Sequence, residues 1–199
     1  MRMAMLVGAG AVALAAAGTA AGADRVAYTG TFDADPGTER VLVRDAPCPQ
    51  ADAGRTCRVV AVDDAGRITP VSTPAMAGYG YGATATARVV RLGGAPRILI
   101  RKDTVGGTGS SPAEITVVRW DGARGRTMLR LAKTTRGLPA GFAYVSAVSA
   151  RPFAGGRLLT REALNRSEDP TCCASAVRVR VWAARGDRLV VTSTRVRPT

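Results

Sequence analysis

Four cysteines are the residues of this chain most suited to covalent chemistry, and two of them are adjacent. They are Cys48, Cys57, Cys172 and Cys173. A metal site is disfavoured because adjacent thiols without histidine make a poor tetrahedral ligand set, and a redox pair would favour C-x-x-C spacing. We therefore expect structural disulfides. Four cysteines allow three pairings. We favour Cys48–Cys57, which closes a short loop, together with Cys172–Cys173, and the two crossed pairings stay open.

The chain contains no histidine. This excludes Ser-His-Asp and Cys-His nucleophiles, histidine-ligated zinc and an imidazole pH switch. An enzyme would have to use carboxylates, a Ser-Lys pair or arginine alone, and a pair of carboxylates could support glycoside hydrolysis. Glu114 and Glu162 are the only glutamates inside expected strands, and no spacing links them, so we expect each to pair with a cation. We predict no enzyme, catalytic residue, cofactor or metal, and keep a histidine-free hydrolase as an alternative.

The net charge is +13, and nearly all of the positive charge is arginine. Such a charge attracts anionic polymers or membrane surfaces, although a solvated basic surface shaped by a GC-rich genome gives the same composition. Nucleic acid is a poor candidate partner. Only 5% of residues are aromatic, whereas single-strand binding needs aromatic stacking platforms.

One group of arginines has a regular spacing. In residues 176–182, alternation sends the valines to one face of a strand and Arg178 and Arg180 to the other. An even-length turn would bring Arg195 and Arg197 onto the same face as Arg178 and Arg180. Because like charges facing across strands are unfavourable, a bound anion or interleaved carboxylates would relieve them. We therefore predict an anion-binding strip made by these four arginines.

The elements that position these residues are short strands separated by turn residues. Their spacing of 8–15 residues predicts an all-β antiparallel sandwich or barrel of about ten strands with disulfide-stapled loops. Residues 158–165 could instead form a helical turn. Loop 72–83 or loop 105–112 could rim a pocket. The expected strands cover residues 26–32, 40–44, 58–62, 67–71, 87–92, 97–101, 114–120, 127–131, 144–149, 157–164, 176–182 and 188–196.

The first 23 residues have the three parts of a secretory signal peptide. Arg2 supplies the positive charge, residues 3–17 the apolar stretch, and Ala21-Gly22-Ala23 the small-residue cleavage site. We predict cleavage after Ala23 and a single all-β domain over 24–199. No later stretch is long and apolar enough for a transmembrane helix, so we expect an exported monomer.

Residues 158–191 carry a family resemblance. Asp169-Pro170 before the cysteine pair, Ser175 after it, and the alternating run 177–182 resemble the C-terminal part of the actinobacterial LppP/LprE family of exported proteins and lipoproteins of uncharacterised function. Ala174 stands where that family commonly has proline, and a lipidation cysteine is lacking. The resemblance implies an exported β protein and supplies no catalytic residues.

These observations together predict a secreted, non-catalytic β module that is either associated with the envelope or extracellular. Its partner would be an anionic cell-wall polymer or envelope surface, bound through an arginine-rich sheet face. The alternative is a domain that binds a small ligand in a pocket rimmed by loops.

Overall fold

The computed structural model describes residues 23–32, 37–46, 58–72, 82–106, 109–170 and 173–199. These residues form twelve strands, and no helix occurs among them. All neighbouring strands pair antiparallel and follow one another in chain order. The predicted all-β antiparallel class is therefore confirmed. The strands form three four-stranded sheets, in place of the two sheets of a sandwich or the single sheet of a barrel.

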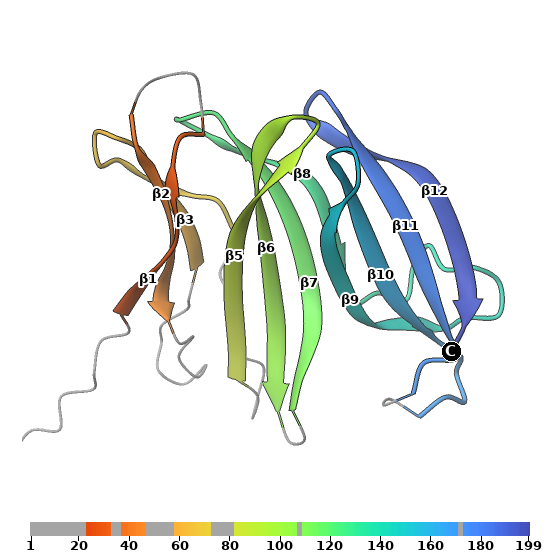
Figure 1. The fold of residues 1–199 in the computed structure, drawn as a ribbon. Coiled ribbons are helices and arrows are strands. Elements are labelled where there is room, and N and C mark those ends of the chain that lie inside the picture. The colour runs from red at the N-terminus through yellow and green to blue at the C-terminus, as the bar shows by residue number, and fades with distance from the viewer. Residues whose placement is uncertain (1–22, 33–36, 47–57, 73–81, 107–108, 171–172) are drawn as a thin grey trace, which may run out of the picture.

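The three sheets follow one another along the chain and lie side by side (Figure 1). The first contains β1 (Ala23–Gly30), β2 (Glu39–Ala46), β3 (Arg58–Val62) and β4 (Ile68–Pro70). The middle sheet contains β5 (Gly82–Leu92), β6 (Ala95–Gly106), β7 (Gly109–Trp120) and β8 (Gly125–Ala132). The third contains β9 (Tyr144–Phe153), β10 (Arg157–Asn165), β11 (Ala176–Arg185) and β12 (Arg188–Pro198).

Two local expectations are settled by these bounds. Residues 158–165 lie in β10 and are a strand rather than a helical turn. The predicted loop 105–112 is wrong for most of its length, because β6 continues to Gly106 and β7 starts at Gly109. Cross-strand pairing of the two strands continues to their ends, so this part of the chain is a long hairpin.

The middle sheet is buried on both faces, which makes it the central layer. Ile98 and Ile100 contribute to a core shared with the first sheet. Leu99, between them in β6, contributes to a second core shared with the third sheet. This period of two is the alternation expected of a strand, and a strand buried on both faces reads as the apolar run seen here. Each outer sheet therefore has one face against the middle layer and one face directed away from it.

The third sheet is also fixed to the middle sheet at the hairpin ends. The backbone N–H of Gly93 donates to the carbonyl of Gly156 at 2.8 Å, joining the β5–β6 turn to the β9–β10 turn. Asp187, in the β11–β12 turn, forms ion pairs with Arg119 of β7 and Arg126 of β8. These contacts, together with the shared core, hold one face of the third sheet against the middle sheet.

Candidate anion-binding site

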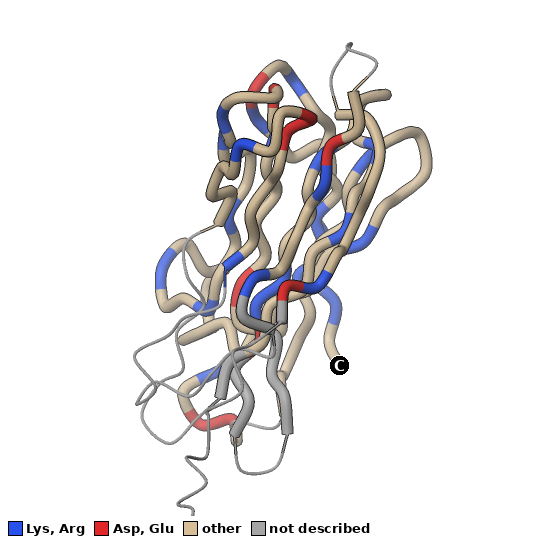
Figure 2. The backbone as a smooth tube through the Cα atoms, turned by 90° about the vertical axis from the view of Figure 1, so that its left-hand side faces the viewer, with Lys and Arg blue, Asp and Glu red and all other residues tan. Residues whose placement is uncertain are grey.

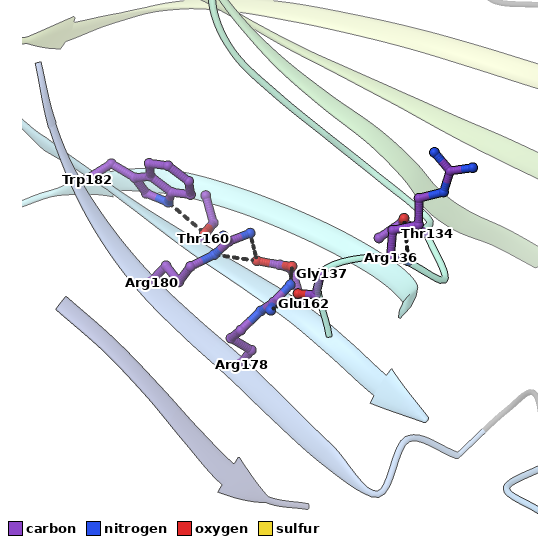
Figure 3. Close-up of polar contacts among 8 residues, drawn as sticks. All are labelled: Thr134, Arg136, Gly137, Thr160, Glu162, Arg178, Arg180 and Trp182. Carbon is purple, nitrogen blue, oxygen red and sulfur yellow. Dashed lines mark hydrogen bonds and ion pairs between the residues drawn. The ribbon is translucent and has the colours of Figure 1, made fainter. Parts of the chain in front are cut away.

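The inner face of the third sheet holds a buried ionic cluster around Glu162 of β10 (Figure 3). Glu162 is 2% exposed, and its carboxylate accepts hydrogen bonds from Arg178 and Arg180 of the neighbouring strand β11. Arg180 Nε lies 2.8 Å from Oε1. Arg178 also donates to the carbonyl of Gly137 at 2.9 Å. One carboxylate thus serves two guanidiniums from the same strand.

The cluster continues to an aromatic side chain. Trp182 Nε1 donates to Thr160 Oγ1 at 2.9 Å, and the Arg180 guanidinium lies 4.7 Å from the centre of the Trp182 ring. A cation over an indole face is a favourable contact. Arg178 and Arg180 therefore have partners inside the protein. The Glu162 carboxylate offsets the repulsion between the two guanidiniums, which is one of the two arrangements expected from the sequence.

The predicted common face for four arginines is wrong. Counting back from the two-residue turn, a regular hairpin would place Arg195 opposite Arg178. The register instead shifts between Val181 and Trp182, so that Arg195 pairs with Val179 and Arg197 with Val177. The extra residue, Thr192, donates its hydroxyl to the Val181 carbonyl at 3.2 Å. This β-bulge moves Arg195 and Arg197 to the outer face, because one added residue reverses the side-chain phase of a strand.

The outer face of the third sheet forms a groove of about 680 Å³. Its volume is in the range of sites that bind small molecules. Strands β9 to β12 all contribute to it. Five arginines line the groove: Arg151, Arg157, Arg161, Arg195 and Arg197.

The arginines of the outer face lack the carboxylate partners of the inner pair. Lys and Arg residues outnumber Asp and Glu in the sequence, 28 to 15. Figure 2 marks the two kinds of residue along the described backbone. No acidic side chain occurs among the residues that line the groove. Within the described part of the chain, Arg151, Arg161, Arg195 and Arg197 have no ion pair. An anion in the groove would supply the missing charge.

The floor between these arginines is apolar. Leu159 is 9% exposed, and the half-buried Val177, Val179 and Val181 follow one another on the same face of β11. Val179 lies between Arg161 of β10 and Arg195 of β12 in the cross-strand register. The groove therefore presents a hydrophobic strip with positive charge on both sides.

Glu114 and Glu162, the candidate carboxylates for hydrolysis, are both held in ion pairs, as expected. Glu114 pairs with Lys102 at 2.9 Å and with Arg130 at 2.6 Å. Burial acts to raise the pKa of Glu114, but the hydrogen bonds from Lys102 and Arg130 outweigh it, so that the pKa lies below its ordinary value. A general acid needs the opposite shift. Glu114 therefore acts as a cross-strand linker.

The segment around the cysteine pair is held by Asp169. Ser175 Oγ donates to both carboxylate oxygens of Asp169, at 2.6 and 2.8 Å, and the Arg166 N–H donates to Oδ2 at 2.7 Å. These bonds lower the pKa of Asp169, and the Ser175 hydroxyl is the largest cause. The Ser175 carbonyl accepts from the Thr199 N–H at 3.2 Å, which connects this segment to the end of the β12 hairpin and to the groove.

The described residues include one of the four cysteines in the disulfide prediction. Cys173 is disulfide-bonded, while Cys48, Cys57 and Cys172 lie outside the described residues. The favoured pairing stays a prediction.

The expected signal peptide also lies outside the described residues except for Ala23, the first residue of β1. The described ranges contain no helix that could cross a membrane and no group of three or more potential metal ligands.

Comparison of the chain with models of protein families, with curated proteins and with solved structures found no match. The LppP/LprE resemblance therefore stays a prediction. The site must be interpreted from its own residues.

The sequence interpretation missed three residues of the outer face: Arg151, Arg157 and Arg161. A signal for two of them was present. Arg157, Leu159 and Arg161 alternate with the buried Leu158, Thr160 and Glu162 in β10. Applying the same period of two to this strand would have placed Arg157 and Arg161 together on one face.

Proposed function

We propose that this protein is an exported, non-catalytic β module that binds an anionic component of the cell envelope through the outer face of the β9–β12 sheet. The N-terminal signal pattern supports export. The groove supports binding, because it gathers five arginines without an acidic side chain among its lining residues. This excess of positive charge carries the proposal. Anions are attracted to such a face by Coulomb forces that are not offset locally.

The arrangement also favours a discrete site over a diffuse basic surface. Arg161 and Arg195 flank Val179 in register, and strands two apart in a sheet lie about 10 Å from each other. Two guanidiniums at that separation can converge on one multivalent group or on neighbouring groups of a polymer. Guanidinium binds phosphate and carboxylate through paired N–H donors.

The alternative proposal from the sequence, a pocket rimmed by loop 72–83 or by loop 105–112, has no support of this kind. Most of the first loop lies outside the described residues, and most of the second is the β6–β7 hairpin. A small ligand would therefore bind in the groove on the outer face of the sheet, through the same arginines that we propose for a polymer.

Polyphosphate, a defined stand-in for an anionic wall polymer, tests the proposal by calorimetric titration of the purified oxidised protein. We expect binding that weakens steeply between about 50 and about 300 mM salt, values chosen to span the usual range of screening. The double variant Arg161→Ser/Arg195→Ser should bind about tenfold more weakly, since it loses two charge-assisted contacts. Its free energy of unfolding should change by less than about 0.5 kcal/mol, as for other surface substitutions.

The matched control is Arg58→Ser/Arg124→Ser. It removes the same charge from two exposed residues that do not line the groove, and should bind within about twofold of the unmodified protein. Equal weakening in both double variants would show that net charge, and not this face, attracts the polymer. Absence of any salt-dependent binding would overturn the proposal altogether.

A further inference from the structure

The groove differs from a simple polyanion site because its centre is hydrophobic. Leu159, Val177, Val179 and Val181 form the floor, and Phe153 adds a ring at one end that is 37% exposed. A hydrophilic polymer lying across the arginines would leave this strip against water. Burial of apolar surface is favourable in proportion to its area. The floor is therefore matched to a ligand that has an apolar part.

The register places cations beside the floor at several levels. Arg197 lies beside Val177, Arg161 and Arg195 lie on either side of Val179, and Arg151 lies beside Leu159. The three valines alternate along β11 and span about 14 Å at the ordinary rise of a strand. A chain lying along β11 would thus cover the valines while its charged end meets guanidiniums.

The end of the groove near Phe153 has a further feature. Arg157 lies over the Phe153 ring, 5.1 Å from its centre, and donates from Nε to the Ala154 carbonyl at 2.9 Å. This arginine is already oriented by its own neighbours. Four groove arginines have no such partner in the described structure. Three of them, Arg161, Arg195 and Arg197, gather beside Val177 and Val179 and form the better site for a charged head group, whereas Arg151 lies beside Leu159.

We infer that the anionic component is an amphiphile, a lipid phosphate whose head group binds Arg161, Arg195 and Arg197 and whose aliphatic tail lies along Leu159, Val179 and Val181. This inference rests on the proposed function of the same face and specifies its ligand. The guanidiniums supply the head-group contacts, and the apolar side chains of the floor supply the contact with the tail. A polymer without an apolar part would use only the first of these.

Butyl, octyl and dodecyl phosphate, each below its micelle concentration, test the inference by titration into the oxidised protein, with polyphosphate as the reference anion. We expect affinity to rise about twofold for each added methylene, since a tail covered on one side gains about half of the free energy of full burial. Val179→Thr keeps the shape of the side chain and adds a hydroxyl to the floor. It should lower the affinity for each alkyl phosphate and reduce the dependence on chain length, while leaving polyphosphate affinity within about twofold.

The matched control is Val196→Thr, because Val196 is 42% exposed in β12 and does not line the groove. It should keep the full dependence on chain length. Thermal unfolding of each variant checks that it is folded, and Val181→Thr provides a second floor variant should Val179→Thr unfold.

Three outcomes would count against the inference. Tight binding of polyphosphate with alkyl phosphates of all lengths binding equally would overturn the amphiphile and retain the proposed function, with a polymer as ligand. The same gain with chain length in Val179→Thr and in the unmodified protein would place the tail elsewhere and overturn the inference. Failure of every phosphate probe to bind would overturn both proposals.

Discussion

The two faces of the β9–β12 sheet use the same residue type for different purposes. On the inner face, Arg178 and Arg180 share the carboxylate of Glu162, and Arg178 is 9% exposed. On the outer face, Arg195 and Arg197 are exposed and have no ion pair in the described structure. All four arginines belong to one hairpin. The difference shows that register, and not the number of arginines, decides which cations stabilise the fold and which are available to a ligand.

The largest effect is expected from breaking the inner cluster with Glu162→Gln. Arg178 would then be a buried cation without its carboxylate, and loss of one member of a buried pair costs about 3–5 kcal/mol. Urea denaturation at neutral pH measures the change in the free energy of unfolding. Glu168→Gln, in an exposed turn, is the control and should cost less than about 0.5 kcal/mol. A cost below about 1 kcal/mol for Glu162→Gln would mean that the two faces do not differ as described.

A smaller effect is expected from Gly156→Ala, which weakens the docking of the inner face and replaces no residue that lines the groove. Gly156 has φ of +65°, and a Cβ there would lie 3.2 Å from the Gly93 nitrogen. Left-handed strain and a disturbed hydrogen bond to Gly93 together should cost about 2 kcal/mol. Polyphosphate affinity should be unchanged.

Gly186→Ala is the matched control for that substitution. Gly186 has φ of +57°, and a Cβ added there would meet nothing within 4 Å, so only the backbone strain of about 1 kcal/mol remains. Equal unfolding free energies for the two variants would contradict a role for the contact between the Gly93 and Gly156 turns.

The smallest effect is expected from Asp169→Asn, and it should depend on pH. Because hydrogen bonds lower the pKa of Asp169 in the folded protein, its ionised form adds stability above the unfolded pKa, near about pH 4. That contribution is lost as the pH falls through the folded pKa. Asp169→Asn should therefore unfold at a lower temperature than the unmodified protein at about pH 7, and the gap should close at about pH 2. A gap of equal size at both pH values would exclude the carboxylate charge as its cause.

The strands could be predicted from the sequence because each depends on a local pattern of turn residues and alternating side chains. Turn residues and alternating side chains predicted a stretch that overlaps each of the twelve strands, although the predicted number was about ten. The expectation that Glu114 and Glu162 form ion pairs is confirmed. The arrangement in three sheets could not be predicted in this way, because it depends on both faces of β5–β8 packing at once. Nothing in the local sequence marks Thr192 as the bulged residue, and the face of Arg195 follows from that one residue.

The bulge at Thr192 has a consequence for how such a face can arise. A bulge increases the local twist of its strand. The residue that places Arg195 and Arg197 on the outer side is therefore also expected to twist β12, whose residues line the groove. Adding one residue to a hairpin can therefore move arginines from the inner face of a sheet to its outer face, where they line a groove. A new binding surface then needs no new arginine, and its origin would be visible as a gap of one position between related sequences.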